Sequence, residues 1–257
     1  DQIMNQQLFL VEKCFSKISA IAKDFNAVGN IFAIYADLGI SSAHLDDLNR
    51  GFSFTHDYAD LDMRLNPKIS TLKAMDILNQ YYERDLRNML YKYVQEKHAK
   101  DLAKEICNRR RKRAILKVKD LVKIVNQVIK YSQKEKKHTL AKVFLALRME
   151  VNDEISVLKK FLLGAFKILA VNGRIAVISF HSTEDRVVKK YFLDLCGIQR
   201  KIDLPKFVPL TDSEISKYVG KKASIIKPFP IMPSLEEIQE NPRCRSAKLR
   251  ILEKTEE

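Results

Sequence analysis

Residues 31–39 are Ile-Phe-Ala-Ile-Tyr-Ala-Asp-Leu-Gly, six apolar residues that end in an acidic residue shortly before a glycine. The run is short and its apolar residues do not alternate with polar ones, which is typical of a strand buried on both faces. A polar residue at the carboxyl end of a strand in a parallel sheet lies at the edge where ligands bind. The stretch therefore predicts a strand of a parallel α/β sheet, with Asp37 at the ligand edge.

A second stretch of the same kind, Ile175–Phe180, lies far along the chain and ends in His181-Ser182. Before it, apolar residues recur every three or four positions from Phe144 to Leu169, which predicts one long helix. Asn172-Gly173 follows, and both residue types tolerate the positive φ that ends a helix. Helix, turn and strand together make half of a βαβ unit.

The chain between these strands has a different character. It contains no glycine between Gly51 and Gly164, and its apolar residues have helical spacing in segments such as 86–91 and 120–129. The simplest organisation is one α/β domain split by an all-helical insertion. We expect the first half of the α/β domain at 1–51, the insertion at 52–142 and the second half at 143–257.

The charge is strongly positive and unevenly distributed. The chain has 46 Lys and Arg against 32 Asp and Glu, a net charge of +14, and its pI is about 9.5. Between Lys97 and Lys142 there are 16 basic and 4 acidic residues, and the densest run is Arg109–Arg113. One interpretation is a phosphate-binding face. The alternative is a solvated helix end followed by a loop.

Several classes of protein are excluded or disfavoured. No run of about 18 apolar residues is present, so the sequence predicts no membrane-spanning helix. None of the seven glycines is spaced as G-x-G, so the sequence given has no glycine-rich phosphate loop. Four scattered cysteines indicate a reducing, cytoplasmic compartment. Five scattered histidines give no support to a metal site.

Ordered blocks of sequence add a resemblance. Asp37–Ser42, Leu45–Asp47, Arg50–Phe54 and Leu61–Arg64 resemble the RsmH (MraW) family, and further blocks follow in the same order at 96–100, 146–154, 172–174, 178–186 and 241–250. The family comprises S-adenosylmethionine-dependent methyltransferases that modify the exocyclic N4 of a cytidine in small-subunit ribosomal RNA. The resemblance covers nearly the whole chain.

The resemblance implies a Rossmann-like methyltransferase domain interrupted by a helical substrate-recognition domain, in agreement with the pattern above. It implies S-adenosyl-L-methionine as cofactor, and small-subunit ribosomal RNA or the assembled small subunit as partner. No membrane or metal partner is implied, and a homodimer stays open. An inactive, truncated homologue that at most binds RNA is the alternative function.

The family's cofactor contacts can be carried over at three positions. Phe15 matches an aromatic residue that flanks the adenine, and Asp37 matches the acid at the end of the central strand. His44 stands where the family usually has Gln, and it can still donate or accept one hydrogen bond.

The chain departs from the family pattern at other places too. Family members open with a strand and a G-x-G-G-H-type loop, a unit of roughly 30 residues, whereas seven residues precede Leu8. We therefore expect an amino-terminally truncated chain whose first βα unit is missing. In addition, Tyr58-Ala59-Asp60 adds a residue to a tight Asp-Gly-Pro turn.

Methyl transfer to N4 requires a group that accepts an N4 hydrogen bond, orients the nitrogen lone pair and excludes water. Asp37 and His181 are our catalytic candidates, and the alternative for Asp37 is a structural acid that binds loop amides. His181, with Ser182, is expected to line the substrate pocket, and the alternative is a turn residue followed by a helix N-cap at Ser182. The cytidine must be unstacked to reach such a pocket.

The remaining candidates are basic or aromatic. Residues expected to contact RNA, with simple surface charge as the alternative, are Arg109, Arg110, Arg111, Arg113, Arg243 and Arg245. Arg64 and Arg148 could contact phosphate or a cofactor carboxylate, or form structural ion pairs. Phe52 and Phe54 are more typical of core residues than of base-stacking platforms.

Overall fold

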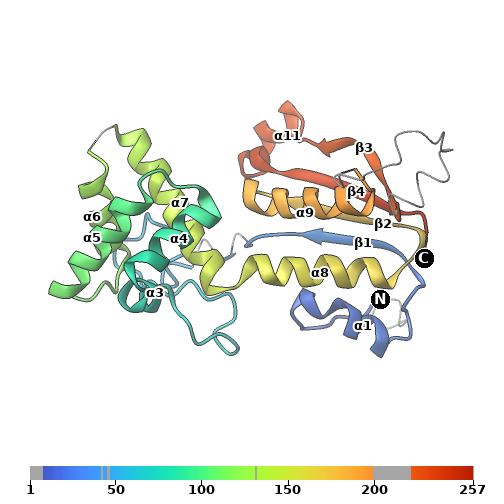
Figure 1. The fold of residues 1–257 in the computed structure, drawn as a ribbon, viewed down its shortest axis with the longest axis horizontal. Helices are drawn as coiled ribbons and strands as arrows, with labels where there is room; N and C mark the ends of the chain where they lie inside the picture. The colour runs from blue at the N-terminus through green and yellow to red at the C-terminus, as the bar shows by residue number, and fades with distance from the viewer. Residues whose placement is uncertain (1–7, 42, 45–46, 131, 199–220, 257) are drawn as a thin grey trace, which may run out of the picture. The chain divides into compact units, whose positions relative to one another are not determined.

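A computed structural model describes residues 8–41, 43–44, 47–130, 132–198 and 221–256 (Figure 1). By its internal contacts the chain divides into a sheet unit, Asp1–Gly39 with Ile155–Glu257, and a helical unit, Ile40–Glu154. These divisions differ from the predicted boundaries at 51/52 and 142/143. The segment before Gly51 packs within the helical unit, since the Met63 amide donates to the Arg50 carbonyl at 2.9 Å. Helix α7 (Gln133–Val151) runs through position 142 without a break.

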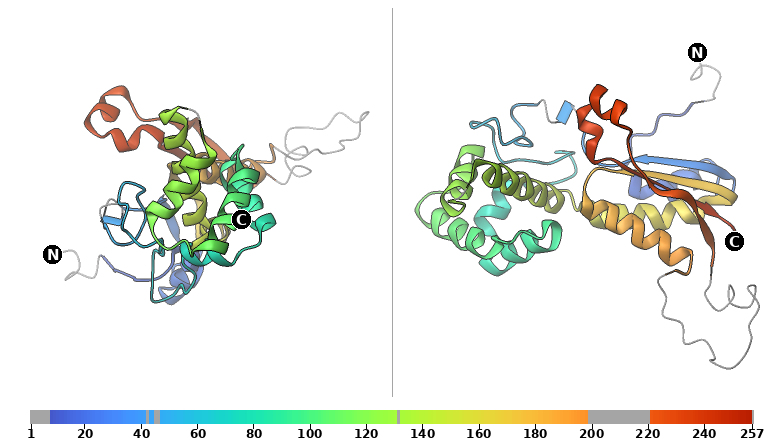
Figure 2. Two further views of the ribbon diagram at one scale, coloured as in Figure 1. Left: turned by 90° about the vertical axis from the view of Figure 1, so that its left-hand side faces the viewer. Right: turned by 90° about the horizontal axis from the view of Figure 1, so that it is seen from above.

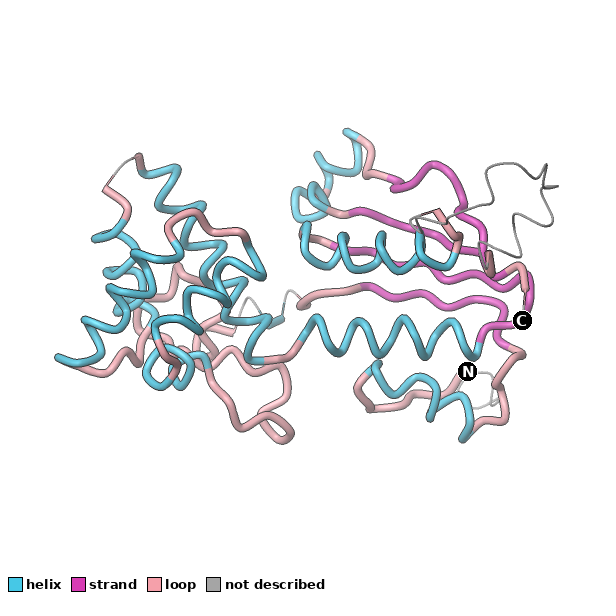
Figure 3. The backbone as a smooth tube through the Cα atoms, viewed as in Figure 1, coloured by secondary structure: helices cyan, strands magenta, loops and turns pink. Residues whose placement is uncertain are grey.

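The sheet unit contains a mixed four-stranded sheet in the order β1-β2-β4-β3. Its strands are β1 (Ile31–Asp37), β2 (Leu169–Ser179), β3 (Ala223–Ile231) and β4 (Lys248–Lys254). β1 and β2 are parallel, as predicted, and β4 is antiparallel to both β2 and β3. Figure 3 shows these strands as one set of adjacent magenta segments.

Helices cover one face of this sheet. The unit contains the short η1 (Phe15–Lys17), α1 (Ile18–Asp24), α8 (Glu154–Ile168), α9 (Ser182–Leu195), α11 (Leu235–Glu240) and η2 (Pro242–Ser246). α8 and α9 lie on the same side of the sheet in both Figure 1 and Figure 2. Ile34, Ile175 and Val177 of the strands form one core with Phe161 of α8 and Phe192 of α9.

The other face of the sheet is partly exposed in the described part of the chain. Tyr35 is paired with Ala176, and Ala176 with Ile251, so these apolar residues form a row across the strands. Tyr35 is 64% exposed. The prediction that residues 31–36 are buried on both faces is therefore wrong: the continuous apolar run is a strand with one covered face.

The helical unit consists of α3 (Ala74–Gln80), α4 (Glu83–Val94), α5 (Ala99–Lys112), α6 (Val118–Val128) and α7, which confirms the helical prediction for this region. A carboxylate inside it binds two phenols: Tyr81 Oη lies 3.1 Å and Tyr93 Oη 2.7 Å from Glu150. Burial and the Glu150 charge raise the pKa of Tyr81 to about 12. Burial, the hydrogen bond to Glu150 and the Glu150 charge raise the pKa of Tyr93, so both phenols stay protonated donors. None of the helices in the described ranges is long and apolar enough to cross a membrane.

The long helix predicted from Phe144 to Leu169 is two helices, because α7 ends at Val151 and α8 begins at Glu154. Asn152 makes the break. Its Oδ1 accepts from the Leu65 amide at 2.7 Å, and its Nδ2 donates to the carbonyls of Met63 and Arg148, both at 2.8 Å. These bonds satisfy backbone groups of a distant loop at the point where the hydrogen bonds of the helix end. Apolar periodicity continues through the break, so the pattern alone could not reveal it.

Asn172-Gly173 also has a different role from the predicted helix stop. α8 ends earlier, at Ile168, and both residues lie within β2. Asn172 has φ 64°, and the pairing with β1 is irregular here, between Ile31 and Ala33. A Cβ on Gly173 would lie 2.9 Å from the Ile31 carbonyl oxygen. The two residues therefore form a bulge that lets the strands approach closely.

We predict that Asn152→Ala lowers the free energy of unfolding by about 2 kcal/mol, because it removes the partners of the Leu65 amide and of two carbonyls. Urea denaturation followed by circular dichroism measures this change. Asp153→Asn is the control, since Asp153 is exposed in the same junction, and it should change stability by less than about 0.5 kcal/mol. Equal stability of Asn152→Ala and the parent would contradict the assigned role.

Candidate functional site

The carboxyl ends of β1 and β2 meet at one edge of the sheet. Asp37, the last residue of β1, pairs with Ile178, and the Leu38 amide donates to the Ile178 carbonyl at 3.1 Å. Gly39 follows with φ +106°, and a Cβ built there would lie 3.7 Å from the Phe180 ring. The structure therefore brings the segments that carry Asp37 and His181 to the same edge, as the sequence predicted.

β3 and β4 contribute to the same edge. β4 begins with Lys248, which is paired with Ser179, and the next residue, Leu249, is paired with Ile231 at the end of β3. The 3-10 helix η2 leads directly into β4, so its exposed Arg243 and Arg245 come just before this edge. Two of the six predicted RNA-contact residues thus belong to the sheet unit.

The Asp37 carboxylate is exposed at the strand end. Among the residues that the structure describes, no loop amide or basic side chain is bonded to it. The alternative role, a structural acid that satisfies loop amides, therefore finds no support in this part of the chain. The carboxylate is available to accept hydrogen bonds from a ligand.

His181 is the N-cap of α9, so the predicted cap at Ser182 is displaced by one residue. Its Nδ1 accepts from the Glu184 amide at 3.4 Å, and its Nε2 lies 3.0 Å from Glu184 Oε1. The Phe180 amide donates to the second oxygen of the same carboxylate, at 3.4 Å. Because Glu184 is buried and contacts both residues, it fixes the turn that follows β2.

A buried ion network stands beside this turn and was not among the predicted site residues. Asp185 of α9 accepts from Arg250 Nε at 2.7 Å and Nη2 at 3.2 Å, and Lys248 Nζ lies 3.4 Å away. The Arg250 guanidinium also lies 4.3 Å from the centroid of the Phe229 ring. Burial alone would raise the pKa of Asp185, but the hydrogen bonds and charges of Arg250 and Lys248 outweigh it and hold this pKa below its ordinary value.

Sequence position could not pair Asp185 with Arg250, because 65 residues separate them. A weaker signal was available. Lys248 and Arg250 stand two residues apart in the sequence, as residues on one face of a strand do, and Glu184-Asp185 follows the apolar run 175–180. A basic face of a strand is complementary in charge to the acidic first turn of a helix that packs on the same sheet. The pattern does not specify which residues pair.

Phe15, the first residue of η1, is 43% exposed. Its ring packs edge-on against Phe161 of α8, with 5.2 Å between centroids. The rest of the ring stays open for another flat group. Phe15 and Asp37 thus belong to the same unit.

His44 belongs to the helical unit. Its Nδ1 lies 3.3 Å from the Ser41 amide, which donates to it, and 2.9 Å from Ser41 Oγ. Burial lowers the pKa of His44, the charge of Arg50 lowers it further, and Asp47 opposes both. A neutral imidazole that accepts at Nδ1 carries its proton on Nε2. His44 therefore offers one N–H donor.

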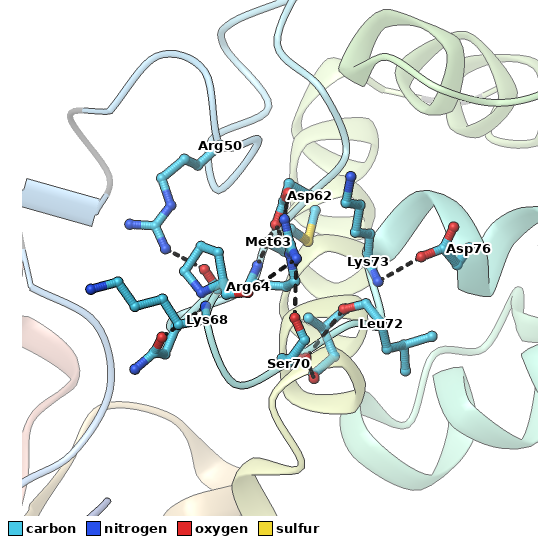
Figure 4. A network of polar contacts seen from close by, with 12 residues as sticks. Arg50, Asp62, Met63, Arg64, Lys68, Ser70, Leu72, Lys73 and Asp76 are labelled. Atoms are coloured by element: carbon cyan, nitrogen blue, oxygen red, sulfur yellow. Dashed lines mark hydrogen bonds and ion pairs between the residues drawn. The ribbon is translucent and has the colours of Figure 1, made fainter. Parts of the chain in front are cut away.

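Arg64 and Arg148 form structural ion pairs. Arg64 binds Asp62 through Nε at 2.8 Å and Nη2 at 2.7 Å, and its Nη1 donates to the Ser70 carbonyl at 3.0 Å (Figure 4). Arg148 binds Glu154 in the same two-pronged way, at 2.7 and 2.8 Å. Both guanidinium groups are thus engaged within the chain.

A further arginine, Arg50, holds the loop that carries Arg64. Arg50 donates to the backbone carbonyls of Arg64 and Leu65, the latter at 3.0 Å (Figure 4), and its guanidinium lies 5.2 Å from the Phe52 ring centroid. Phe52 is buried, and Phe54 contacts Phe144 of α7. Both phenylalanines therefore serve the packing of the helical unit, as expected.

The basic residues at the end of α5 do not all have the same surroundings. Arg110 donates to the Leu78 carbonyl at 2.9 Å and so caps the end of α3. Arg109, Arg111 and Lys112 line a groove of about 370 Å³ together with Glu105, Asn108 and Gln127. Arg113 follows the helix and is exposed. The side chains directed to solvent place several positive charges around one concave surface.

Known proteins resemble this chain closely. The MraW methylase family matches residues 2–255. A Dictyoglomus turgidum protein named ribosomal RNA small subunit methyltransferase H is 41% identical over 247 residues, 96% of this chain and 74% of that protein. Proteins with the same name from Coxiella burnetii and Fusobacterium nucleatum are 37% and 39% identical over 249 and 240 residues, covering 96% and 93% of this chain and 77% and 73% of theirs.

We predict that Asp185→Asn lowers the free energy of unfolding at neutral pH by about 3 kcal/mol, because the buried Arg250 loses its counter-charge. The folded-state pKa of Asp185 is depressed, so its stabilisation is complete above the unfolded-state pKa and is lost as pH falls through the folded value. The difference between parent and variant should therefore shrink below about pH 4. Urea titrations from neutral to acidic pH measure it. The exposed pair Lys13–Asp24 supplies the control, since Asp24→Asn should cost less than about 1 kcal/mol. A pH-independent difference would contradict the assignment.

Proposed function

The chain belongs to the MraW methylase family, and from this premise we propose that it methylates the exocyclic N4 of a cytidine in small-subunit ribosomal RNA at the carboxyl edge of its sheet. As a member of this family it is a ribosomal RNA methyltransferase, and S-adenosyl-L-methionine is its methyl donor. The observation that supports the position of the site is the exposed Asp37 carboxylate, which lies beside the turn after β2.

Residues of the sheet unit fit the cofactor. Gly39 has a positive φ and no side chain beyond the strand end, so backbone and ligand can approach each other there. Phe15 offers the open part of its ring to a flat heterocycle. We assign Phe15 and Asp37, both in the sheet unit, to the cofactor. When bound, S-adenosylmethionine supplies an electrophilic methyl group on a sulfonium centre.

The chain's own residues must make N4 reactive, because its lone pair is delocalised into the cytosine ring. Asp37 accepts a hydrogen bond from the N4 amino group, which orients the amine and favours charge development on it. His181 acts as a positioning residue, since its contacts with Glu184 hold the turn next to Asp37. The base reaches this edge after it leaves its stack.

RNA contacts follow from charge and exposure. The groove residues Arg109 and Arg111, together with exposed Arg113, are assigned to backbone phosphates. Arg243 and Arg245 are assigned to phosphates near the sheet edge. Arg110 is assigned a structural role, because its guanidinium already holds the Leu78 carbonyl. The assembled small subunit and isolated ribosomal RNA are both possible forms of the substrate.

The first test is methyl transfer from labelled S-adenosylmethionine to isolated small ribosomal subunits, with nucleoside digestion and mass spectrometry of the product. We expect N4-methylcytidine, and a different methylated nucleoside would overturn the proposal. We expect Asp37→Ala to lower kcat about 100-fold, the usual contribution of one positioned acid–base group. Asp24→Ala, an exposed acid of the same unit, is the matched control and should leave kcat within about twofold. RNA binding with no transfer by the parent chain would favour the binding-only alternative.

A second test addresses the phosphate-binding residues. The triple substitution Arg111→Gln, Lys112→Gln and Arg113→Gln should weaken RNA binding and reduce the slope of log K against log salt by about 0.7 to 0.9 for each phosphate that the protein no longer neutralises. The control removes three exposed lysines of α8 instead: Lys159, Lys160 and Lys167. Fluorescence anisotropy across a salt series measures both variants. Equal slopes for the two triple variants would contradict the assignment of the groove.

A further inference from the structure

Tyr58 is an exposed aromatic residue beside a lysine in the helical unit. Its side chain is 77% exposed, and the Lys119 ammonium lies 4.3 Å from the centroid of its ring. An ammonium over one face of a tyrosine is attracted by the ring quadrupole and leaves the other face open. The pair therefore presents a flat ring and a positive charge together to solvent.

The backbone around Tyr58 is held in place on both sides. The Val118 amide donates to the Ala59 carbonyl at 3.0 Å, the Lys119 amide to the Asp57 carbonyl at 2.9 Å, and the Leu61 amide to the Leu116 carbonyl at 2.9 Å. Ala59 and Leu61, which flank Asp60 in this paired segment, are both buried. The turn thus fixes the position of Tyr58 without burying its side chain, so little order is lost when a ligand stacks on it.

The surrounding charge favours a polyanion. Between Arg109 and Lys123 there are eight basic residues and one acidic residue, Asp120. The Asp120 carboxylate accepts from the Lys117 amide at 3.1 Å and so caps α6. On the Tyr58 side of the contact, Asp60 is paired with Lys117 at 2.7 Å. Asp57 is exposed and is the acidic group that opposes this trend.

We propose that Tyr58, together with Lys119, is a stacking platform for an unpaired base of RNA, with the ammonium placed for the neighbouring phosphate. This inference rests on the proposed function, because it takes RNA as the partner of the helical unit. Proteins that bind single-stranded RNA combine cationic grooves with aromatic rings on which bases stack. A lone exposed tyrosine is ordinary on a protein surface, but a fixed tyrosine under a lysine, next to the most basic segment of the chain, has the composition of such a platform.

The experiment uses the absence of tryptophan from the chain. Tyr58→Trp introduces one indole, and stacking of a base on it quenches its fluorescence. The probes are a 12-nucleotide single-stranded RNA, the same sequence as a duplex, and heparin, a polyanion without bases. We expect quenching by the single strand and little by the duplex or by heparin. Quenching by heparin to the same extent would overturn the inference, because it would report charge alone.

Binding of the fluorescein-labelled single strand to the full chain, measured by anisotropy, provides the second readout. Tyr58→Ala should weaken affinity about 10-fold, within the range for the loss of one stacked base, whereas Tyr58→Phe should retain it within about twofold. Tyr82→Ala is the matched control: Tyr82 is 76% exposed, but Glu83 and Asp85 follow it. Parent-like binding by Tyr58→Ala, or an equal loss in Tyr58→Phe, would overturn the platform.

Methyl transfer is assayed separately, so the two proposals can fail independently. If N4-methylcytidine is formed and Tyr58→Ala binds RNA as the parent does, the platform is wrong and the proposed function stands. If no transfer occurs and the Tyr58 effects hold, the helical unit stacks on RNA and the proposed chemistry is wrong.

Discussion

The parallel pairing of β1 with β2 is the interaction on which the site depends. The two strands are far apart in the sequence, with Tyr35 paired with Ala176 and Asp37 with Ile178. Parallel strands cannot be joined by a tight turn and need a long connection. Here the connection includes the whole helical unit and α8. Because the strands are parallel, their carboxyl ends coincide, and the chemistry of Asp37 and the turn at His181 share one edge.

Buried and half-buried polar groups then fix the loops at the ends of the strands and helices. Each is a carboxylate or amide with several partners: Glu184 at the turn after β2, Asp185 under Arg250, Glu150 between two phenols, and Asn152 at the break between α7 and α8. A hydrophobic core sets which elements pack but tolerates small shifts. Hydrogen-bonded polar groups are directional, and a buried one left without a partner is costly. They therefore specify the position of loops that the core alone would leave free.

The sequence was sufficient for the strand at 31–36, the strand at 175–180 and the helical nature of the middle of the chain. These features depend on local periodicity, and local periodicity is visible in one sequence. It was insufficient where distant contacts decide. The helix break at Asn152 depends on Leu65 and Met63, and the exposed side of β1 depends on what covers the sheet. The N-cap at His181 instead of Ser182 shows the usual one-residue uncertainty of a boundary.

The net charge overstates the surface available to a polyanion, because geometry takes some arginines out of it. Arg50, Arg64, Arg110 and Arg148 each bind a carbonyl or a carboxylate within the helical unit. A guanidinium suits this use, since its planar fork reaches two acceptors and it is more weakly hydrated than an ammonium. A count of positive residues cannot separate internal from external arginines. What distinguishes the end of α5 is that Arg109, Arg111 and Lys112 line a groove. The local density of outward charge, rather than the total of +14, is therefore what supports the phosphate-binding face that we propose there.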